Sequence, residues 1–424
     1  MKNTNIAKKF AKYVTLNIFG MIGLSCYILA DTFFVARGIG VNGLTALNLA
    51  IPIYSFIHGA GLMVGMGGAT RFSISRSPTV FTQSLYFILI LSGFFVTIGV
   101  FFSGGLASLL GANFATLEMT STYLQIILCF SPMFMLNNLI LCFIRNDGNP
   151  KLPMQAMLIG SLSNIILDYI FVFPLQMGMF GAALATGTSP IISLLVLSLH
   201  FVKKNNSFMP HKTKLHPHDI KDISMLGSSA LITELSSGIV MIIFNSIILK
   251  LSGNVGVAAY GIVANIALVV ISIFTGISHG SQPLISDSYG RGEIKDVKKL
   301  FKYGGVTAIL FAVGIYIVTF IFAEPIVSAF NKEQNLELAK IAIKGLRIYF
   351  VAFVFVGFNV LTATYFCSCD EPKKAFLISM LRGFIVIIPT TFLLSAIFGM
   401  VGIWCALAVS ELIVFAVAVK QIRS

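Results

Sequence analysis

Long apolar runs separated by short polar breaks extend along the whole chain. Most runs are about 20 residues or longer, which is the length that an α-helix needs to cross the hydrocarbon core of a bilayer. The pattern therefore predicts an all-α integral membrane protein with twelve transmembrane helices. The expected spans are 13–36, 44–70, 84–110, 117–144, 154–174, 180–202, 223–250, 256–284, 300–325, 337–366, 375–396 and 399–420.

The second half of the chain repeats the pattern of the first. Because each half has an even number of spans, both copies share one orientation and are related by an axis along the membrane normal. We predict an N-terminal six-helix lobe (residues 1–202), a linker (203–222) and a C-terminal lobe (223–424) around a central cavity. The similar segments are GLTALNLAIPI (43–53) and GVAAYGIVANI (256–266), NPKLPM (149–154) and EPKKAF (371–376), and FGAALA (180–185) and VGIWCALA (401–408).

Composition and charge agree with a membrane protein. Hydrophobic residues make up 57% of the chain and charged residues only 11%, against about a quarter charged in soluble domains. The net charge of +13 comes from connections between spans, which argues against a nucleic-acid partner. With the N-terminus inside, 23 of the 29 Lys and Arg lie on the inner side. By the positive-inside rule this predicts a multi-pass plasma-membrane protein with both termini in the cytoplasm.

Several other segments bear on processing, linker and chemistry. The basic N-terminus has no cleavage site after a short apolar core, so we expect no removed signal peptide.

Residues 203–222 are expected to form a solvated cytoplasmic linker beside lipid head groups; metal or anionic-lipid binding by its His and Lys residues is the alternative. Cys367 and Cys369 form a C-x-C pair without the further ligands of a zinc site. No catalytic set is present, so we expect neither an enzyme nor a resident cofactor or metal.

Asp31 and Asp168 stand out because each places a carboxyl group inside an apolar run. Counting from the span starts puts both at a similar depth in the outer half of the bilayer. Asn164 lies one helical turn before Asp168 on the same face, and Thr186 enters from the outer side at comparable depth.

These four side chains predict a proton or Na⁺ site in the N-terminal lobe, because acids inside a membrane are rare and usually functional. Uptake of a proton or Na⁺ would neutralise two repelling carboxylates in a poorly hydrated compartment. The structural alternative is that Asp31 caps a helix end and Asp168 forms a structural pair.

Other ionisable residues within the spans have separate interpretations. Glu234 lies near mid-membrane and is a candidate for binding a cationic substrate or a second ion; hydrogen bonding to nearby Ser and Thr is the alternative. Arg382 and Glu411 lie at equal depth on adjacent antiparallel helices and predict a structural ion pair. His58 and His279 are expected to be hydrogen-bonded packing residues, with a proton relay still open for His58.

The order and spacing of several motifs resemble the multidrug and toxic compound extrusion (MATE) transporters, and most of all their bacterial DinF/MepA-like branch. The resemblance covers essentially the whole chain. It rests on twelve spans in two halves, on ADTFFVARGIG (30–40), on GMGGATRFSISR (65–76), and on N-x-x-x-D in span 5 with a Thr eighteen residues later.

The resemblance implies a proton- or sodium-coupled antiporter that exports amphipathic, often cationic, organic compounds, with lipids as its other partners and a monomer as its expected state. It assigns the N-lobe cation site to Asp31, Asn164, Asp168 and Thr186, and adds Tyr27 to that network. Two departures stand out: span 1 has no proline to bend it, and span 10 lacks the acid that would accompany Glu234. A flippase for lipid-linked saccharides remains the alternative, although such proteins tend to carry basic residues in the cavity.

Overall fold

The protein is all-helical throughout the parts described in a computed structural model, which are residues 2–203, 206–331 and 334–423. The N-terminal half contains α1 (Lys2–Gly38), α2 (Val41–Ser75), α3 (Val80–Leu109), α4 (Leu117–Cys129), α5 (Ser131–Asn146), α6 (Lys151–Val172), α7 (Gly178–Leu197) and α8 (Leu199–Val202). The C-terminal half contains α9 (Pro217–Gly290), α10 (Ile294–Ile321), α11 (Ala323–Phe330), α12 (Leu336–Tyr349), the 3₁₀ turn Phe350–Ala352, α13 (Phe353–Ser368), α14 (Pro372–Met380), the π turn Leu381–Ile385 and α15 (Ile387–Arg423).

These helices make the twelve predicted crossings. Within the described ranges, nine helical stretches are long and apolar enough to cross a membrane, and α4 with α5 forms a tenth span bent by 47°. Two of the nine stretches reverse direction, at Gly253 in α9 and at Gly399 in α15, where the backbone leaves the helical region. Dividing each at its reversal gives twelve. The predicted fourth and tenth spans are the broken ones, at Phe130 and at the 3₁₀ turn respectively.

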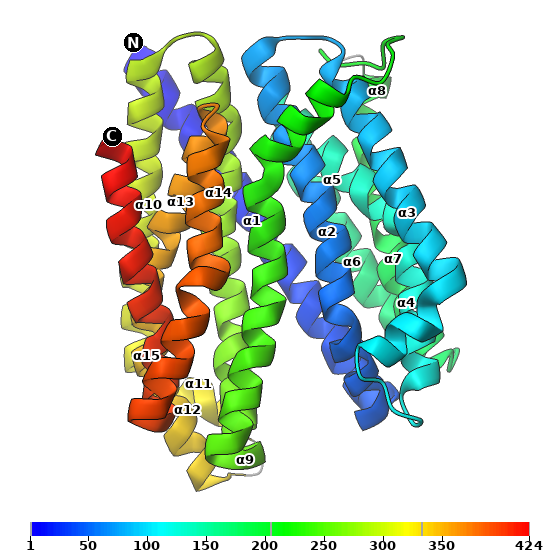
Figure 1. The fold of residues 1–424 in the computed structure, drawn as a ribbon, viewed down its shortest axis with the longest axis vertical. Helices are drawn as coiled ribbons and strands as arrows, with labels where there is room; N and C mark the ends of the chain where they lie inside the picture. Colours follow the sequence, from blue (N-terminus) through cyan, green and yellow to red (C-terminus); the bar gives the residue numbers. More distant parts are fainter. Residues whose placement is uncertain (1, 204–205, 332–333, 424) are drawn as a thin grey trace.

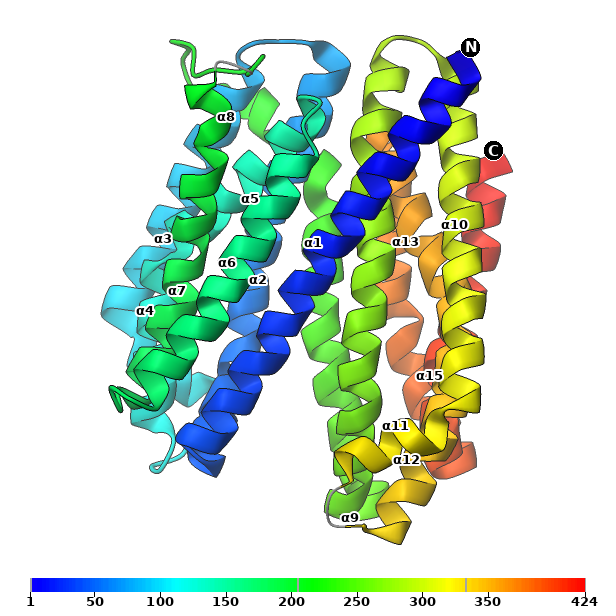
Figure 2. The same ribbon diagram turned by 180° about the vertical axis from the view of Figure 1, so that it is seen from behind.

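The two halves form two lobes that stand side by side with both termini at one end, which we call the terminal end (Figures 1 and 2). The backbone supports the internal repeat, because left-handed turn residues recur after equivalent helices. The equivalent residues of the two halves are Gly40 and Gly253, Arg76 and Gly292, Gly111 and Gln334, Gly148 and Asp370, and Gly178 and Gly399.

The lobes pack tightly against each other near the terminal end. A Cβ at Gly227 of α9 would lie only 1.8 Å from the carbonyl oxygen of Met63 on α2, so this backbone contact requires glycine. Ion pairs reinforce it: Arg71 Nη2 lies 3.1 Å from Asp222 Oδ2, and Arg76 pairs with Asp287. Towards the opposite end α2 and α9 diverge in both views (Figures 1 and 2). This conformation is therefore closed at the terminal end.

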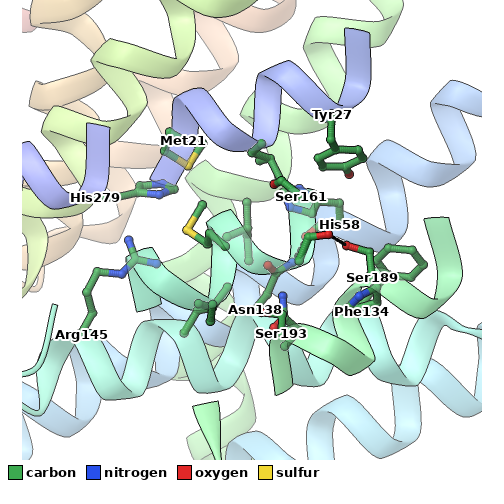
Figure 3. Close-up of a pocket in the computed structure, with 18 of the residues that line it drawn as sticks. Met21, Tyr27, His58, Phe134, Asn138, Arg145, Ser161, Ser189, Ser193 and His279 are labelled. Carbon is green, nitrogen blue, oxygen red and sulfur yellow. Dashed lines mark hydrogen bonds between the residues drawn. The ribbon is translucent and has the colours of Figure 1, made fainter. Parts of the chain in front are cut away.

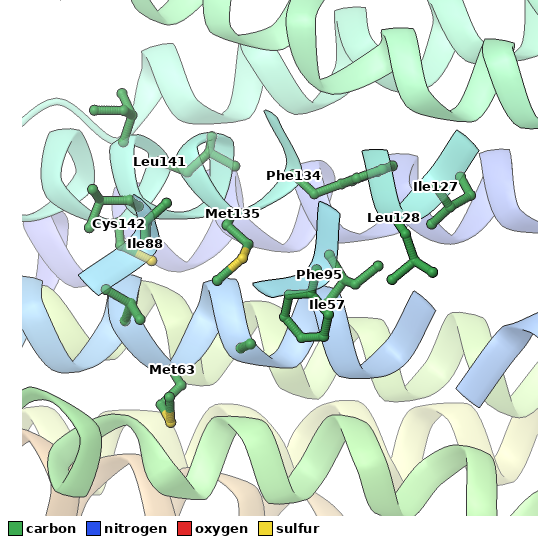
Figure 4. Packing of buried hydrophobic residues seen from close by; sticks show 14 of the residues in the cluster. Ile57, Met63, Ile88, Phe95, Ile127, Leu128, Phe134, Met135, Leu141 and Cys142 are labelled. Carbon is green, nitrogen blue, oxygen red and sulfur yellow. The ribbon is translucent and has the colours of Figure 1, made fainter. Parts of the chain in front are cut away.

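Buried apolar side chains fill the interior of each lobe. In the N-terminal lobe Ile57 of α2, Phe95 of α3, Leu128 of α4 and Met135 of α5 interlock with little or no exposure (Figure 4). Many other large apolar side chains lie on the outer surface, as a lipid environment permits. Because lipid is as apolar as these side chains, van der Waals contact and polar links between helices hold the bundle together.

The segment between the lobes is mostly exposed, as expected from the sequence, but several contacts anchor it to the N-terminal lobe. Residues 206–216 run along the N-terminal lobe, with Phe208 fully buried among the rings of Phe72, Phe81 and Phe143. Gln83 of α3 donates to the Lys214 carbonyl at 2.6 Å and accepts from the His216 amide at 3.0 Å. The next helix begins at Pro217, six residues before the expected boundary of the C-terminal lobe.

Candidate functional site

The carboxyl groups of Asp31 and Asp168 meet inside the N-terminal lobe. Asp31 lies on α1 and Asp168 on α6; their side chains are 6% and 0% exposed. The two carboxyl groups lie close enough to interact with each other directly. Within the described chain neither oxygen of Asp168 receives a donor from another residue, and neither does Oδ1 of Asp31. Two carboxylates in such surroundings repel each other unless a proton or metal cation neutralises them.

The other predicted members gather at the same place. Asn164, one turn before Asp168 on α6, and Thr186 on α7 are both buried. Both polar atoms of the Asn164 amide and the hydroxyl of Thr186 lack partners among the described residues. Unpaired buried polar atoms are costly and call for a bound water or ion. The arrangement offers carboxylate, amide and hydroxyl oxygens, which suit a proton or Na⁺ equally.

Three tyrosines border this site, and the residue pattern pointed to none of them. The hydroxyl of Tyr27, which only the family resemblance suggested, lies 2.6 Å from that of Tyr54 on α2. Tyr123 of α4, 3% exposed, faces Thr186 and lies within electrostatic range of Asp31 and Asp168. A tyrosine in an apolar span is common, so no pattern in the sequence separated these three from packing residues.

Glu234 makes its contact across the boundary between the lobes. Its Oε2 lies 3.6 Å from Nδ1 of His58 on α2, and its side chain remains 31% exposed. His58 in turn stacks on the Tyr54 ring, with 6.0 Å between centroids. Polar contacts thus continue from Tyr27 through Tyr54 and His58 to the C-terminal lobe. The alternative of hydrogen bonds from neighbouring Ser and Thr to this carboxyl group is not what the structure shows.

Arg382 and Glu411 form an ion pair inside the C-terminal lobe. Arg382 Nη2 lies 2.9 Å from Glu411 Oε1, and Nε donates to both carboxylate oxygens at 3.0 and 3.1 Å. Asn359 of α13 donates to Glu411 Oε2 at 2.7 Å and to its carbonyl at 2.9 Å. Arg382 lies on the π turn, a local widening that helices often adopt where a side chain has a special role.

A cavity lined mainly by the N-terminal lobe extends from the tyrosines towards the terminal end. Tyr27, Tyr54 and His58 line one part of it, while Arg145 of α5 and His279 of α9 lie together at the other (Figure 3). Arg145 directly follows the predicted fourth span (117–144) and was therefore counted with the inner connections, but its side chain is only 4% exposed. His279 is buried, as a packing residue would be, but the hydrogen bond expected for it is absent among the described residues.

Comparison with known proteins places this geometry in a family. The MatE family profile matches residues 17–170 and 230–393, which is more than half of the chain. Multidrug export protein MepA of Staphylococcus aureus is 27% identical over 406 residues, covering 91% of this chain and 86% of that protein. Its counterpart in Staphylococcus saprophyticus subsp. saprophyticus is 26% identical over 401 residues, covering 91% and 87%.

Solved structures share the fold over nearly the full length. The MATE multidrug transporter DinF-BH superposes with a TM-score of 0.89 at 25% identity, covering 98% of this chain and 95% of that one. An outward-facing MATE family transporter of the MOP superfamily gives a TM-score of 0.89 at 24% identity, covering 99% and 95%. With its two six-helix lobes and its matching profile, this chain belongs to the MatE family of membrane transporters and is a multi-pass membrane protein.

Proposed function

We propose that the protein is a cation-coupled antiporter that exports amphipathic, mainly cationic organic compounds by alternating access. The observation that carries the proposal is the Asp31–Asp168 pair, buried in the N-terminal lobe without a basic partner among the described residues. A structural role would call for a counter-charge, as Arg382 provides for Glu411. The names of the MepA relatives and of DinF-BH support multidrug export.

The orientation follows from charge. Most Lys and Arg belong to connections at the terminal end, which favours a plasma-membrane protein with this end in the cytoplasm. Because the lobes are packed together there by Gly227 and the Arg71–Asp222 ion pair, the conformation described corresponds to a state closed to the cytoplasm. In that state an external cation would reach the acid pair.

In the proposed cycle the coupling cation and the cationic substrate compete, because both depend on the negative charge of the acid pair in the N-terminal lobe. Binding of H⁺ or Na⁺ to Asp31 and Asp168 would remove their repulsion and favour release of a cationic substrate to the outside. After the lobes rock, loss of the ion to the cytoplasm would restore the charge that attracts the next substrate. Either ion would supply about 2.3 kcal/mol per 100 mV of membrane potential.

The substrate class follows from the lining of the cavity. Phe134, Tyr27 and Tyr54 offer aromatic faces, and Met21 and Met157 offer flexible thioethers. Such surfaces accept many amphipathic shapes, and aromatic faces favour organic cations. We expect small organic molecules and lipids as partners, a monomer, no nucleic acid and no resident cofactor.

The test is transport by purified protein in liposomes. A fluorescent organic cation is loaded, and a pH gradient or a Na⁺ gradient is imposed separately at zero membrane potential. We expect one of the two gradients to drive the dye against its concentration difference. Equal movement with and without either gradient would contradict coupling, whereas failure to move any dye would contradict export itself.

Glu234→Gln is expected to reduce export partially and in a substrate-dependent way. The amide keeps the size of the side chain but loses the attraction for organic cations and changes the contact with His58. Because the Glu234 side chain is about one-third exposed, solvent screens the interaction and we expect a loss of only a few-fold. Export rates for several cationic dyes provide the measurement; unchanged rates for all of them would assign Glu234 a structural role.

The flippase alternative has weaker support. A cavity that holds pyrophosphate needs several basic groups, and Arg145 is the only Lys or Arg among the described residues that line this one.

A further inference from the structure

Arg145 presents a buried positive charge that no described residue neutralises. Its side chain is 4% exposed, and its one hydrogen-bond contact is a long one of 3.8 Å from Nη2 to the Sγ of Cys142. Nε is buried without any partner. None of the ion pairs within the described ranges includes Arg145. A guanidinium group carries five N–H donors, so most of its capacity is free.

Nearby acids do not fill this role. Asp147, two residues along the chain, is bound instead to the ring of His200 at 2.8 Å and to the amide of Ser207 at 2.9 Å. No Asp or Glu lines the cavity among the residues that the structure describes. Arg145 does lie in the last turn of α5, where the helix dipole favours a cation. That partial charge is small compared with the desolvation of a full guanidinium charge.

The surroundings suit an anion. The guanidinium points into the cavity, and His279 from α9 lies beside it at the same end (Figure 3). A neutral imidazole donates one N–H, and His279 has no hydrogen-bond partner in the described chain. The cavity has a volume of about 60 Å³, which holds a few water molecules or one small ion.

We propose that Arg145 and His279 form a binding site for one small monovalent anion at the terminal end of the N-lobe cavity. The ligand has the size and charge of a chloride ion or of a single carboxylate group. It neutralises the buried guanidinium by charge-assisted hydrogen bonds. Its two possible sources are a free halide and the acid group of an organic solute that enters the cavity. The site is separate from the acid pair and does not depend on the proposed export activity.

Thermal unfolding of the purified full-length protein in detergent tests the site. Sodium chloride, sodium acetate and sodium gluconate are compared at equal ionic strength, gluconate serving as the bulky reference anion. We expect chloride or acetate to raise Tm over gluconate by about 2 °C or more. Stabilisation by acetate alone assigns the site to a carboxylate, and stabilisation by chloride assigns it to a halide. Equal Tm in all three salts would overturn the proposal.

Variants identify the residue responsible. Arg145→Gln is expected to abolish the difference between salts, Arg145→Lys to retain part of it, and His279→Gln to reduce it. Met21→Leu changes the same cavity without changing charge and should keep the full difference. A difference that survives in Arg145→Gln would place the anion elsewhere and refute the site.

Diffraction keeps the test decisive if Arg145→Gln does not fold. Crystals of the unaltered protein grown in sodium bromide should show an anomalous bromide peak at hydrogen-bonding distance from the Arg145 guanidinium. If only acetate stabilises the protein, crystals grown in sodium acetate should instead show density for the acetate carboxylate at this position. Water alone at this position in both would overturn the proposal.

Discussion

Asp31→Asn and Asp168→Asn are each expected to reduce gradient-driven export to background while the protein remains folded. An asparagine keeps the shape of the acid but neither takes up a proton nor balances a Na⁺ charge. Both carboxyl groups are buried and face each other, so the amide replaces one member of an otherwise repelling pair. The measurement is dye export from proteoliposomes under the pH or Na⁺ gradient that drives the unaltered protein.

The control for these variants is a carboxyl group outside the site. Glu118→Gln removes an exposed acid from the first turn of α4 and should leave export unchanged. Thermal unfolding should show that neither Asn variant is less stable, because removing a buried charge avoids its desolvation cost. Full gradient-driven export in either Asn variant would remove the proposed coupling site.

Glu411→Gln is expected to destabilise the C-terminal lobe by about 3–5 kcal/mol, the usual cost of leaving one member of a buried ion pair alone. The carboxylate accepts three hydrogen bonds from Arg382 and one from the Asn359 amide, and a glutamine cannot satisfy the guanidinium. Trp404, the only tryptophan of the chain, is buried in the core of the same lobe. Its fluorescence during thermal unfolding is the measurement.

A double replacement separates charge from packing. Arg382→Met with Glu411→Leu removes both charges and should recover most of the lost stability, together with export activity. A double variant as unstable as Glu411→Gln would instead show that the hydrogen bonds and shape of this pair, rather than an unpaired charge, maintain the lobe. An inactive but stable double variant would mean that the pair takes part in transport.

The helices and their arrangement in two copies follow largely from the sequence. Apolar runs of bilayer length, polar breaks and the Lys and Arg distribution depend on local composition alone, so the twelve predicted spans overlap the observed helices. The largest difference is in α1, which begins at Lys2, well before the predicted start at residue 13. The pairing of Asp31 with Asp168 was also open to prediction. The rise per residue of a helix is constant, so the depth of a side chain in the membrane follows from its position in the span.

The tertiary structure alone decided which faces meet. Counting residues gives the depth of Tyr54 and Tyr123 but not the direction in which they point, so their place beside the acid pair became visible only when α2 and α4 were packed. For the same reason Glu234 meets His58 of the other lobe rather than its sequence neighbours.

The polar connections at the ends of the spans also make contacts that could not be predicted from their position in the chain. Residues 206–216 have a solvated composition, yet Phe208 and the contacts of Gln83 hold them against the N-terminal lobe. Arg145 counts as a connection residue by position but lies buried in the cavity. The sequence determined length, depth and repeat, because these depend on neighbours along the chain. Partners, burial and the cavity depend on contacts between distant segments, which only the folded bundle creates.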